Sequence, residues 1–143
     1  MFQSYDEDIG MLTNKTSKKL VHYVNKQLKR FHLTTEQWLV LVNLSKKNRI
    51  SHKLLAEISD KDQSTLTRIL DIMGRKNFIE RHASENDRRS FVIHITEDGL
   101  NICNKVIPFL EEIFKDILHD ISCEELKIYR KVLLQINKNI DYI

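Results

Sequence analysis

The feature that most limits the fold of this chain is a pair of β-like runs set among helical segments. The runs FIERH (residues 78–82) and FVIHI (residues 91–95) flank the polar stretch ASENDRRS (residues 83–90), which predicts a two-stranded hairpin. An isolated hairpin is only marginally stable in water, so it has to pack against other elements. We therefore expect a mostly α fold in which helices support one small hairpin.

Four helices are expected before the hairpin. Apolar residues at helical spacing predict the first between residues 6 and 30. The second begins at Thr34, whose side chain can cap the helix while Gln37 reaches back to the Thr34 N–H in a capping box. Ser51 is positioned to cap the third helix and Asp62 the fourth.

The fourth helix has one apolar and one polar face. Its apolar stripe consists of Leu66, Ile69, Leu70 and Met73. Its polar face carries Ser64, Thr67, Arg68, Asp71 and Arg75 at steps of three and four residues. Asn77 tolerates a left-handed backbone and suits the residue that ends the helix. The third and fourth helices are thus a short pair joined by a tight turn.

Two further helices are expected after the hairpin. The first runs from Thr96 to about His119 and should kink at Pro108. Ser122 and Glu125 can form another capping box at the start of the last helix. The apolar stripe of that helix is Leu126, Tyr129, Leu133, Ile136 and Ile140, with Val132 beside it. The predicted fold is mostly α with a small β-hairpin wing, a winged helix-turn-helix with long helices at both ends.

Composition favours a cytoplasmic helical protein. Three Gly and one Pro in 143 residues are too few for a disordered or loop-rich all-β chain. No run approaches the ~18 apolar residues of a membrane span, so no membrane partner is expected. The acidic start MFQSYDEDIG does not have the pattern of a signal peptide. Cys103 and Cys123 are too isolated for a disulfide framework or a Cys-based metal site.

Positive charge is concentrated in the middle of the chain. Residues 46–90 carry 11 basic and 7 acidic side chains, whereas residues 91–143 carry 6 basic and 9 acidic ones. Such an asymmetry is expected if the middle of the chain meets a polyanion. The overall net charge of +3 would not by itself indicate nucleic acid.

No recognisable catalytic or cofactor-binding motif occurs in the sequence. The six histidines are single and scattered: His22, His32, His52, His82, His94 and His119. None forms an H-x-x-x-H pair, there is no P-loop or G-x-S-x-G motif, and three glycines cannot supply a dinucleotide fingerprint. We therefore expect no enzyme activity, no cofactor and no metal site.

Four short motifs at fixed spacing carry a resemblance to a known family. They are Leu55-Ala56-Glu57, Ser64-Thr65-Leu66-Thr67-Arg68, Asp87-Arg88-Arg89, and Ile95-Thr96 with Gly99. Over roughly residues 33–100 the sequence resembles the MarR family of bacterial transcription regulators. Asp60 and Asn77 stand where that family often has Gly, and both residue types tolerate a left-handed backbone.

The resemblance implies a homodimer that binds double-stranded DNA. The chain would be a single domain, residues 1–143, with dimerisation helices in residues 1–32 and 97–143 and the winged helix-turn-helix lobe in residues 33–96. A recognition helix, residues 63–76, would enter the major groove, and a wing tip, residues 83–90, would follow the minor groove. The implied function is a sequence-specific transcriptional regulator, a ligand-responsive repressor on an inverted-repeat operator.

Side chains on the expected recognition helix suit contacts with bases. The Gln63 amide can pair with adenine, and the Arg68 guanidinium can bind guanine bidentately. Hydroxyls for phosphates or base edges come from Ser64, Thr65 and Thr67. The predicted phosphate contacts, which position the protein without reading sequence, are Ser51, Lys53, Arg75 and Lys76.

The hairpin tip carries the charged triplet Asp87, Arg88 and Arg89. If Asp87 and Arg89 bridge, they brace the wing and leave Arg88 projecting into the minor groove, whose negative potential attracts arginine. Alternatively, all three are solvated charges. The helix pair that precedes the hairpin favours the contact with DNA.

The sequence alone leaves open whether the protein binds a small effector and whether it has one of two other functions. The resemblance implies that a small phenolic or aromatic effector binds between the dimerisation helices and the lobe. His22, Tyr23, Phe31 and Trp38 can line such a cleft, although aromatic residues at helical spacing are more often core. The other functions are a winged-helix module for an acidic protein partner, and a redox-responsive switch using Cys123 near a helix N-terminus.

Overall fold

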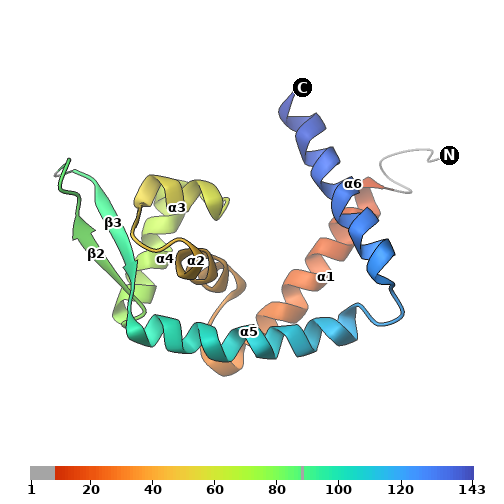
Figure 1. The fold of residues 1–143 in the computed structure, drawn as a ribbon, viewed down its shortest axis with the longest axis horizontal. Coiled ribbons are helices and arrows are strands. Elements are labelled where there is room, and N and C mark those ends of the chain that lie inside the picture. The colour runs from red at the N-terminus through yellow and green to blue at the C-terminus, as the bar shows by residue number, and fades with distance from the viewer. Residues whose placement is uncertain (1–8, 88) are drawn as a thin grey trace. The chain divides into compact units, whose positions relative to one another are not determined.

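The structure, a computed structural model, describes residues 9–87 and 89–143 (Figure 1). The chain divides into two compact units, Met1–Ile107 and Pro108–Ile143. The first unit contains α1 (Gly10–Leu28), the 3-10 helix η1 (Lys29–Phe31), α2 (Thr35–Lys46), β1 (Ile50–Ser51), α3 (His52–Ile58), α4 (Gln63–Arg75), β2 (Ile79–Ala83), β3 (Phe91–Ile95) and the first part of α5 (Glu97–Ile117). The second unit contains the rest of α5 and α6 (Cys123–Asp141).

The helices begin at the predicted caps. Thr34 Oγ1 accepts a hydrogen bond from the Gln37 N–H at 3.1 Å, and Gln37 Oε1 accepts one from the Thr34 N–H at 3.2 Å, which confirms the capping box. Ser51 caps α3 by accepting from the Leu54 N–H at 3.1 Å. Because each cap satisfies an N–H group that has no partner within the helix, local sequence determines where these helices begin.

The core of the first unit lies where α2, α3 and α4 pack together with the sheet. The predicted stripe of α4 is confirmed, since Leu66, Ile69, Leu70 and Met73 are at most 1% exposed. The other fully buried side chains include Leu28, Val40, Leu41, Leu44, Leu55, Ile93, Cys103 and Val106. Burial of this apolar surface supplies the main driving force for folding of the unit.

The sheet has three antiparallel strands in the order β1-β3-β2. The predicted hairpin is confirmed, and its register pairs Ile79 with Ile95 and Ala83 with Phe91. The short strand β1, which pairs Ile50 with Ile93, was not expected. Asn48 extends this connection, because its Oδ1 accepts a hydrogen bond from the Ile95 N–H at 2.9 Å.

Two turns depend on residues that tolerate a left-handed backbone. Asp60, in the turn between α3 and α4, has a φ of 52°, and Asn77, just past the end of α4, has a φ of 62°. Both positions require the conformation that the sequence had suggested. The Asn77 carbonyl also accepts a hydrogen bond from Thr96 Oγ1 at 2.6 Å, which ties the end of α4 to the start of α5.

The second unit contains two helical segments joined by a turn. The helix α5 is continuous through Pro108, and the expected kink there stays a prediction. Ser122 and Glu125 form the predicted capping box at the start of α6. No residue of α6 is buried, and its exposed apolar side chains are Ile128, Tyr129, Val132, Leu134, Ile136 and Ile140. Together the two units confirm the predicted fold class, mostly helical with a small β wing.

Candidate nucleic-acid interface

The start of α4 is held by Asp62. Its Oδ1 accepts a hydrogen bond from the Thr65 N–H at 2.7 Å, and its Oδ2 accepts one from Thr65 Oγ1 at 2.8 Å. These hydrogen bonds from Thr65 hold the pKa of the Asp62 carboxyl below its usual value. The predicted cap is therefore present, and the Thr65 hydroxyl proton, expected to be available to DNA, is used by the cap.

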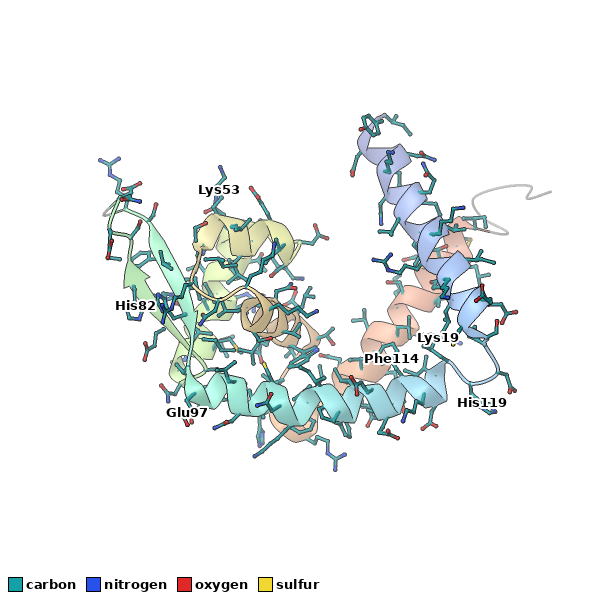
Figure 2. All side chains as sticks on the ribbon, viewed as in Figure 1. Lys19, Lys53, His82, Glu97, Phe114 and His119 are labelled. Carbon is teal, nitrogen blue, oxygen red and sulfur yellow. The ribbon has the colours of Figure 1, made fainter. Side chains whose placement is uncertain are left out.

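A cleft of about 350 Å³ lies between the start of α3, the polar face of α4 and the hairpin. Four residues predicted to touch DNA line it, namely Ser51, Lys53, Gln63 and Thr67, together with the predicted wing residue Arg89. Figure 2 shows the Lys53 side chain extending away from α3. The structure thus brings together two predicted phosphate contacts, two predicted base contacts and one wing residue on a single concave surface.

Four more residues line this cleft and were not predicted: His52, Arg81, Ser90 and Phe91. The position of Arg81 could have been predicted from the sequence. Side chains two residues apart point to the same face of a strand, so Arg81 lies on the face of β2 that carries the buried Ile79. The position of His52 could not, since its partner in the cleft is 15 residues away. Among the described residues that line the cleft, the charged side chains of Lys53, Arg81 and Arg89 are all basic.

Thr67 connects α4 to both walls of the cleft. Its hydroxyl donates a hydrogen bond to the Gln63 carbonyl oxygen at 2.8 Å and lies 3.1 Å from His52 Nε2. Its carbonyl oxygen accepts a hydrogen bond from Arg81 Nη2 at 3.2 Å. Arg81 Nη2 also pairs with Asp71 Oδ1 at 2.7 Å. Through these bonds α3, α4 and β2 are linked to one another around the cleft.

Arg68, the predicted guanine contact, is bound to Glu36 of α2. Arg68 Nη2 lies 3.2 Å from Glu36 Oε2, and Lys61 Nζ lies 3.4 Å from Glu36 Oε1. Burial alone would raise the pKa of the Glu36 carboxyl, but the hydrogen bonds and charges of Arg68 and Lys61 outweigh it and lower that pKa. Arg68 remains largely exposed, with 59% of its side-chain surface accessible. A contact between Arg68 and DNA would therefore compete with its pairing to Glu36.

The predicted phosphate contacts at the end of α4 lie elsewhere. Lys76 donates hydrogen bonds from Nζ to the His32 carbonyl oxygen and, at 3.4 Å, to Gln37 Oε1. Burial also lowers the pKa of the Lys76 ammonium. Lys76 thus fastens the end of α4 to the start of α2, and its role as a phosphate contact stays a prediction. Arg75 lines a separate depression between α4 and β2.

The wing tip is braced, but not in the predicted way. Arg88 lies outside the described residues. Asp87 Oδ1 accepts a hydrogen bond from the backbone N–H of Arg89 at 2.9 Å, and Asp87 Oδ2 accepts one from Ser90 Oγ at 3.2 Å. In the described part of the chain no ion pair joins the Asp87 carboxylate to the Arg89 guanidinium. The short spacing favours the backbone bond, and the Arg89 side chain reaches the cleft instead.

The opposite face of the hairpin carries a pair of histidines. The rings of His82 and His94 are 4.1 Å apart between centroids, and His82 Nε2 lies 3.0 Å from Glu80 Oε2 (His82 is labelled in Figure 2). Burial, followed by the charges of His82 and Arg49, lowers the pKa of His94. No group of three metal-ligating side chains is found among residues 9–87 and 89–143.

The effector and redox candidates are distributed over several environments. His22 and Tyr23 are exposed on α1, Phe31 is half-buried in η1, and Trp38 is buried in α2. Neither of the two clefts described above is lined by any of these residues. Cys123 is exposed at the start of α6, whereas Cys103 is buried, and burial raises the pKa of its thiol. In the part of the chain that the structure describes, no helix has the length and apolar character to cross a membrane.

Comparisons with known proteins agree with this geometry. Residues 33–91 match the MarR family model. The HTH-type transcriptional regulator SarZ of Staphylococcus haemolyticus is 28% identical over 128 residues, which cover 89% of this chain and 86% of SarZ.

Solved structures share the fold. A mutant MarR from E. coli, complexed with operator DNA, superposes with a TM-score of 0.85 at 22% identity, covering 94% of this chain and 99% of that one. BpsR of Bordetella bronchiseptica, whose DNA binding is regulated by 6-hydroxynicotinic acid, gives a TM-score of 0.83 at 20% identity, covering 92% and 99%. The matched segment contains the whole of α2 to β2, so the winged helix-turn-helix of this chain is similar to that of the MarR family of transcriptional regulators.

Proposed function

We propose that this protein is a sequence-specific repressor that binds double-stranded DNA as a homodimer through the cleft between α3, α4 and the hairpin. The observation that carries the proposal is the convergence of predicted DNA contacts from the start of α3 and from α4 on one basic cleft, which Arg89 of the hairpin also lines. A concave surface with excess positive charge attracts a polyanion, and polar side chains within it can read bases. The complex of E. coli MarR with operator DNA supports the same use of this fold.

Within this proposal, α4 is the recognition helix in the major groove. Gln63, exposed at its first position, pairs with adenine, and the neighbouring Ser64 contacts a base edge or phosphate. Lys53 and Ser51 contact phosphates from α3. Arg88 inserts into the minor groove from the wing, and Arg68 reaches guanine once it leaves Glu36.

Dimerisation is proposed through residues 1–32 and 97–143. The exposed apolar side chains of α6, such as Ile128 and Val132, support this assignment because a free apolar helix face is rarely left in water. A two-fold dimer would bind an inverted repeat whose half-sites are about one helical turn, roughly 34–36 Å, apart.

A small aromatic effector is proposed to regulate DNA binding. The regulation of BpsR by 6-hydroxynicotinic acid supports an effector of this chemical class. The exposed pair His22 and Tyr23 and the half-buried Phe31 are the contact candidates, and Trp38 would contribute from the core. The effector must bind the conformation that cannot bind DNA more tightly, because equal affinity for both states would shift nothing.

The proposal is tested by fluorescence anisotropy with the full chain. The labelled duplexes are the region upstream of its own gene, a sequence selected from random DNA, and a scrambled control. Specific binding predicts a preference of about 10³-fold or more for the cognate or selected duplex. Gln63→Ala should reduce that preference, whereas Lys53→Ala should weaken binding to every duplex and reduce the salt slope by about 0.9.

Lys115→Ala serves as the matched control. Lys115 is exposed on α5, and its loss removes one positive charge outside the cleft. It should leave both affinity and preference unchanged. Equal and weak binding to all three duplexes by the unmodified protein would contradict the proposal.

A further inference from the structure

His52 is the titratable side chain that joins α3 to the recognition helix inside the cleft. It is the first residue of α3 and is half-buried, and its Nε2 lies 3.1 Å from Thr67 Oγ1. No motif of the sequence pointed to it, and the assignment of DNA contacts given above does not use it.

The hydrogen bonds around Thr67 determine which nitrogen of His52 carries a proton. A hydroxyl has one proton to donate, and Thr67 Oγ1 donates it to the Gln63 carbonyl oxygen at 2.8 Å. Thr67 Oγ1 therefore accepts from His52, and Nε2 is protonated in both the neutral and the charged ring. A second proton binds at Nδ1, for which no hydrogen-bond partner is found among the described residues, so the ring can become charged without breaking the bond to Thr67.

The surroundings of His52 are suited to an anion. Facing groups are Lys53 on α3, the uncharged Gln63 and Thr67 on α4, Arg81 on β2, and Arg89 in the wing tip. Arg81 is paired with Asp71, whereas Lys53 and Arg89 form no ion pair within the described part of the chain. A phosphodiester drawn to these two cations would also lie near the imidazole, and a nearby negative charge favours its protonated form.

We infer that His52 is a phosphate-binding residue that takes up a proton when DNA enters the cleft, so that the affinity of this protein for DNA rises as the pH falls. The inference rests on the proposed function and deepens it. It adds to the cleft a contact that becomes charged when DNA binds, beside side chains that are always charged. The bond from Nε2 to Thr67 positions the ring, and Nδ1–H donates to a phosphate oxygen in the complex. The contact is independent of sequence, since every nucleotide offers the same phosphate.

The test is a pH series of DNA affinity at constant ionic strength. The full chain is titrated into a labelled 30-bp duplex of mixed sequence between pH 6 and 8.5, beside His52→Gln and His52→Asn. Neither amide can become charged. The Gln amide reaches the position of the imidazole Nε2 and can donate to Thr67, whereas the shorter Asn loses that hydrogen bond. One linked proton changes DNA affinity by at most about tenfold per pH unit. The unmodified protein should therefore bind the duplex more tightly than both variants at pH 6, and its affinity should approach theirs near pH 8.5. At pH 6 its salt slope should exceed theirs by up to about 0.9.

His82→Gln is the matched control, because His82 is an exposed histidine on the face of the hairpin opposite the cleft. It should follow the unmodified protein at every pH. Calorimetric titration in two buffers of different ionisation heat measures proton uptake directly and needs no variant. Parallel pH curves for the unmodified protein and His52→Gln, or no proton uptake on binding, would overturn the inference while leaving the proposed function intact. Absence of DNA binding by the unmodified protein at every pH would overturn both.

Discussion

In the proposed complex with DNA, Glu36 would limit how much positive charge the start of α4 offers to phosphates. Its two carboxylate oxygens engage Arg68 and Lys61 at 3.2 and 3.4 Å. Ion pairs of this exposure contribute only about 0–1 kcal/mol, so a phosphate can displace the carboxylate at low cost. We therefore expect Glu36 to compete with DNA for Arg68 and Lys61.

Replacing Glu36 by Gln should strengthen binding to any duplex and reduce discrimination between duplexes. The substitution frees Arg68 and Lys61, and each new phosphate contact steepens the dependence of log K on log salt by up to about 0.9. Anisotropy titrations over a salt series measure both effects. Glu57→Gln is the matched control, because it removes an exposed negative charge from α3 that forms no ion pair among the described residues. If the two variants behave alike, general charge and not release of Arg68 explains the gain.

Predictions for single side chains from the sequence succeeded where the partner is close in the chain. Thr34 and Asp62 were recognised as caps because the groups they bind lie three residues away. Lys76, the last residue of the expected recognition helix, was predicted to contact phosphate, and its hydrogen bond to the His32 carbonyl oxygen, 44 residues away, was not predicted. A long side chain with several rotamers can choose among distant partners, and only the folded structure decides between them.

At the scale of elements, the joint between the hairpin and α5 depends on a close backbone approach at Gly99. A Cβ atom there would collide with the carbonyl oxygen of Phe78 and come within 2.7 Å of Ile95 Cγ1. The Thr96 hydroxyl holds this joint, because it accepts from the Gly99 N–H at 3.0 Å. The close approach therefore explains the glycine in the motif that follows the second strand.

Gly99→Ala should destabilise the protein by about 1–3 kcal/mol, since backbone atoms have to move to admit the new methyl group. Gly74→Ala is the control within α4: its Cβ would meet Ile79 Cδ1 at 3.8 Å, an ordinary contact. Alanine in a helix interior is favoured over glycine by roughly 0.5–1 kcal/mol, so this variant should be slightly more stable. Urea denaturation followed by circular dichroism measures both. A neutral Gly99→Ala would mean that the joint is looser than the structure indicates.

The elements themselves were predictable in proportion to their length and their local signals. Helical periodicity and caps identified α2, α3, α4 and α6, and the two β-like runs identified the hairpin. The strand β1 has only two residues and exists through its pairing with β3, more than 40 residues later. A pattern of two residues cannot predict such a strand, because its stability comes from pairing with β3.

At the scale of the whole molecule, we propose that the first unit binds DNA and that α6 of the second unit takes part in dimerisation. The first unit has a buried core and a cleft, whereas α6 in the second unit has no buried residue. Its apolar stripe was predicted from the sequence, but periodicity alone cannot tell whether a stripe packs within the chain or against another copy. The exposure of α6 in the single chain favours the second alternative.

Val132→Asp should therefore convert the dimer into a monomer and abolish tight DNA binding. Val132 lies beside the apolar stripe of α6 and is 47% exposed, so a charge there costs little in the single chain but would be desolvated in an interface. Leu134→Asp is the control: Leu134 is 51% exposed, but it lies two residues further, about 200° around the helix. Analytical ultracentrifugation with light scattering reports the mass of each variant.

Two half-sites bound by one dimer gain affinity from their linkage, so a monomer that folds normally should retain only weak binding to a single half-site. If Val132→Asp stays dimeric while Leu134→Asp dissociates, the interface uses the opposite face of α6. If both variants keep the dimer, the second unit holds its partner through other surfaces.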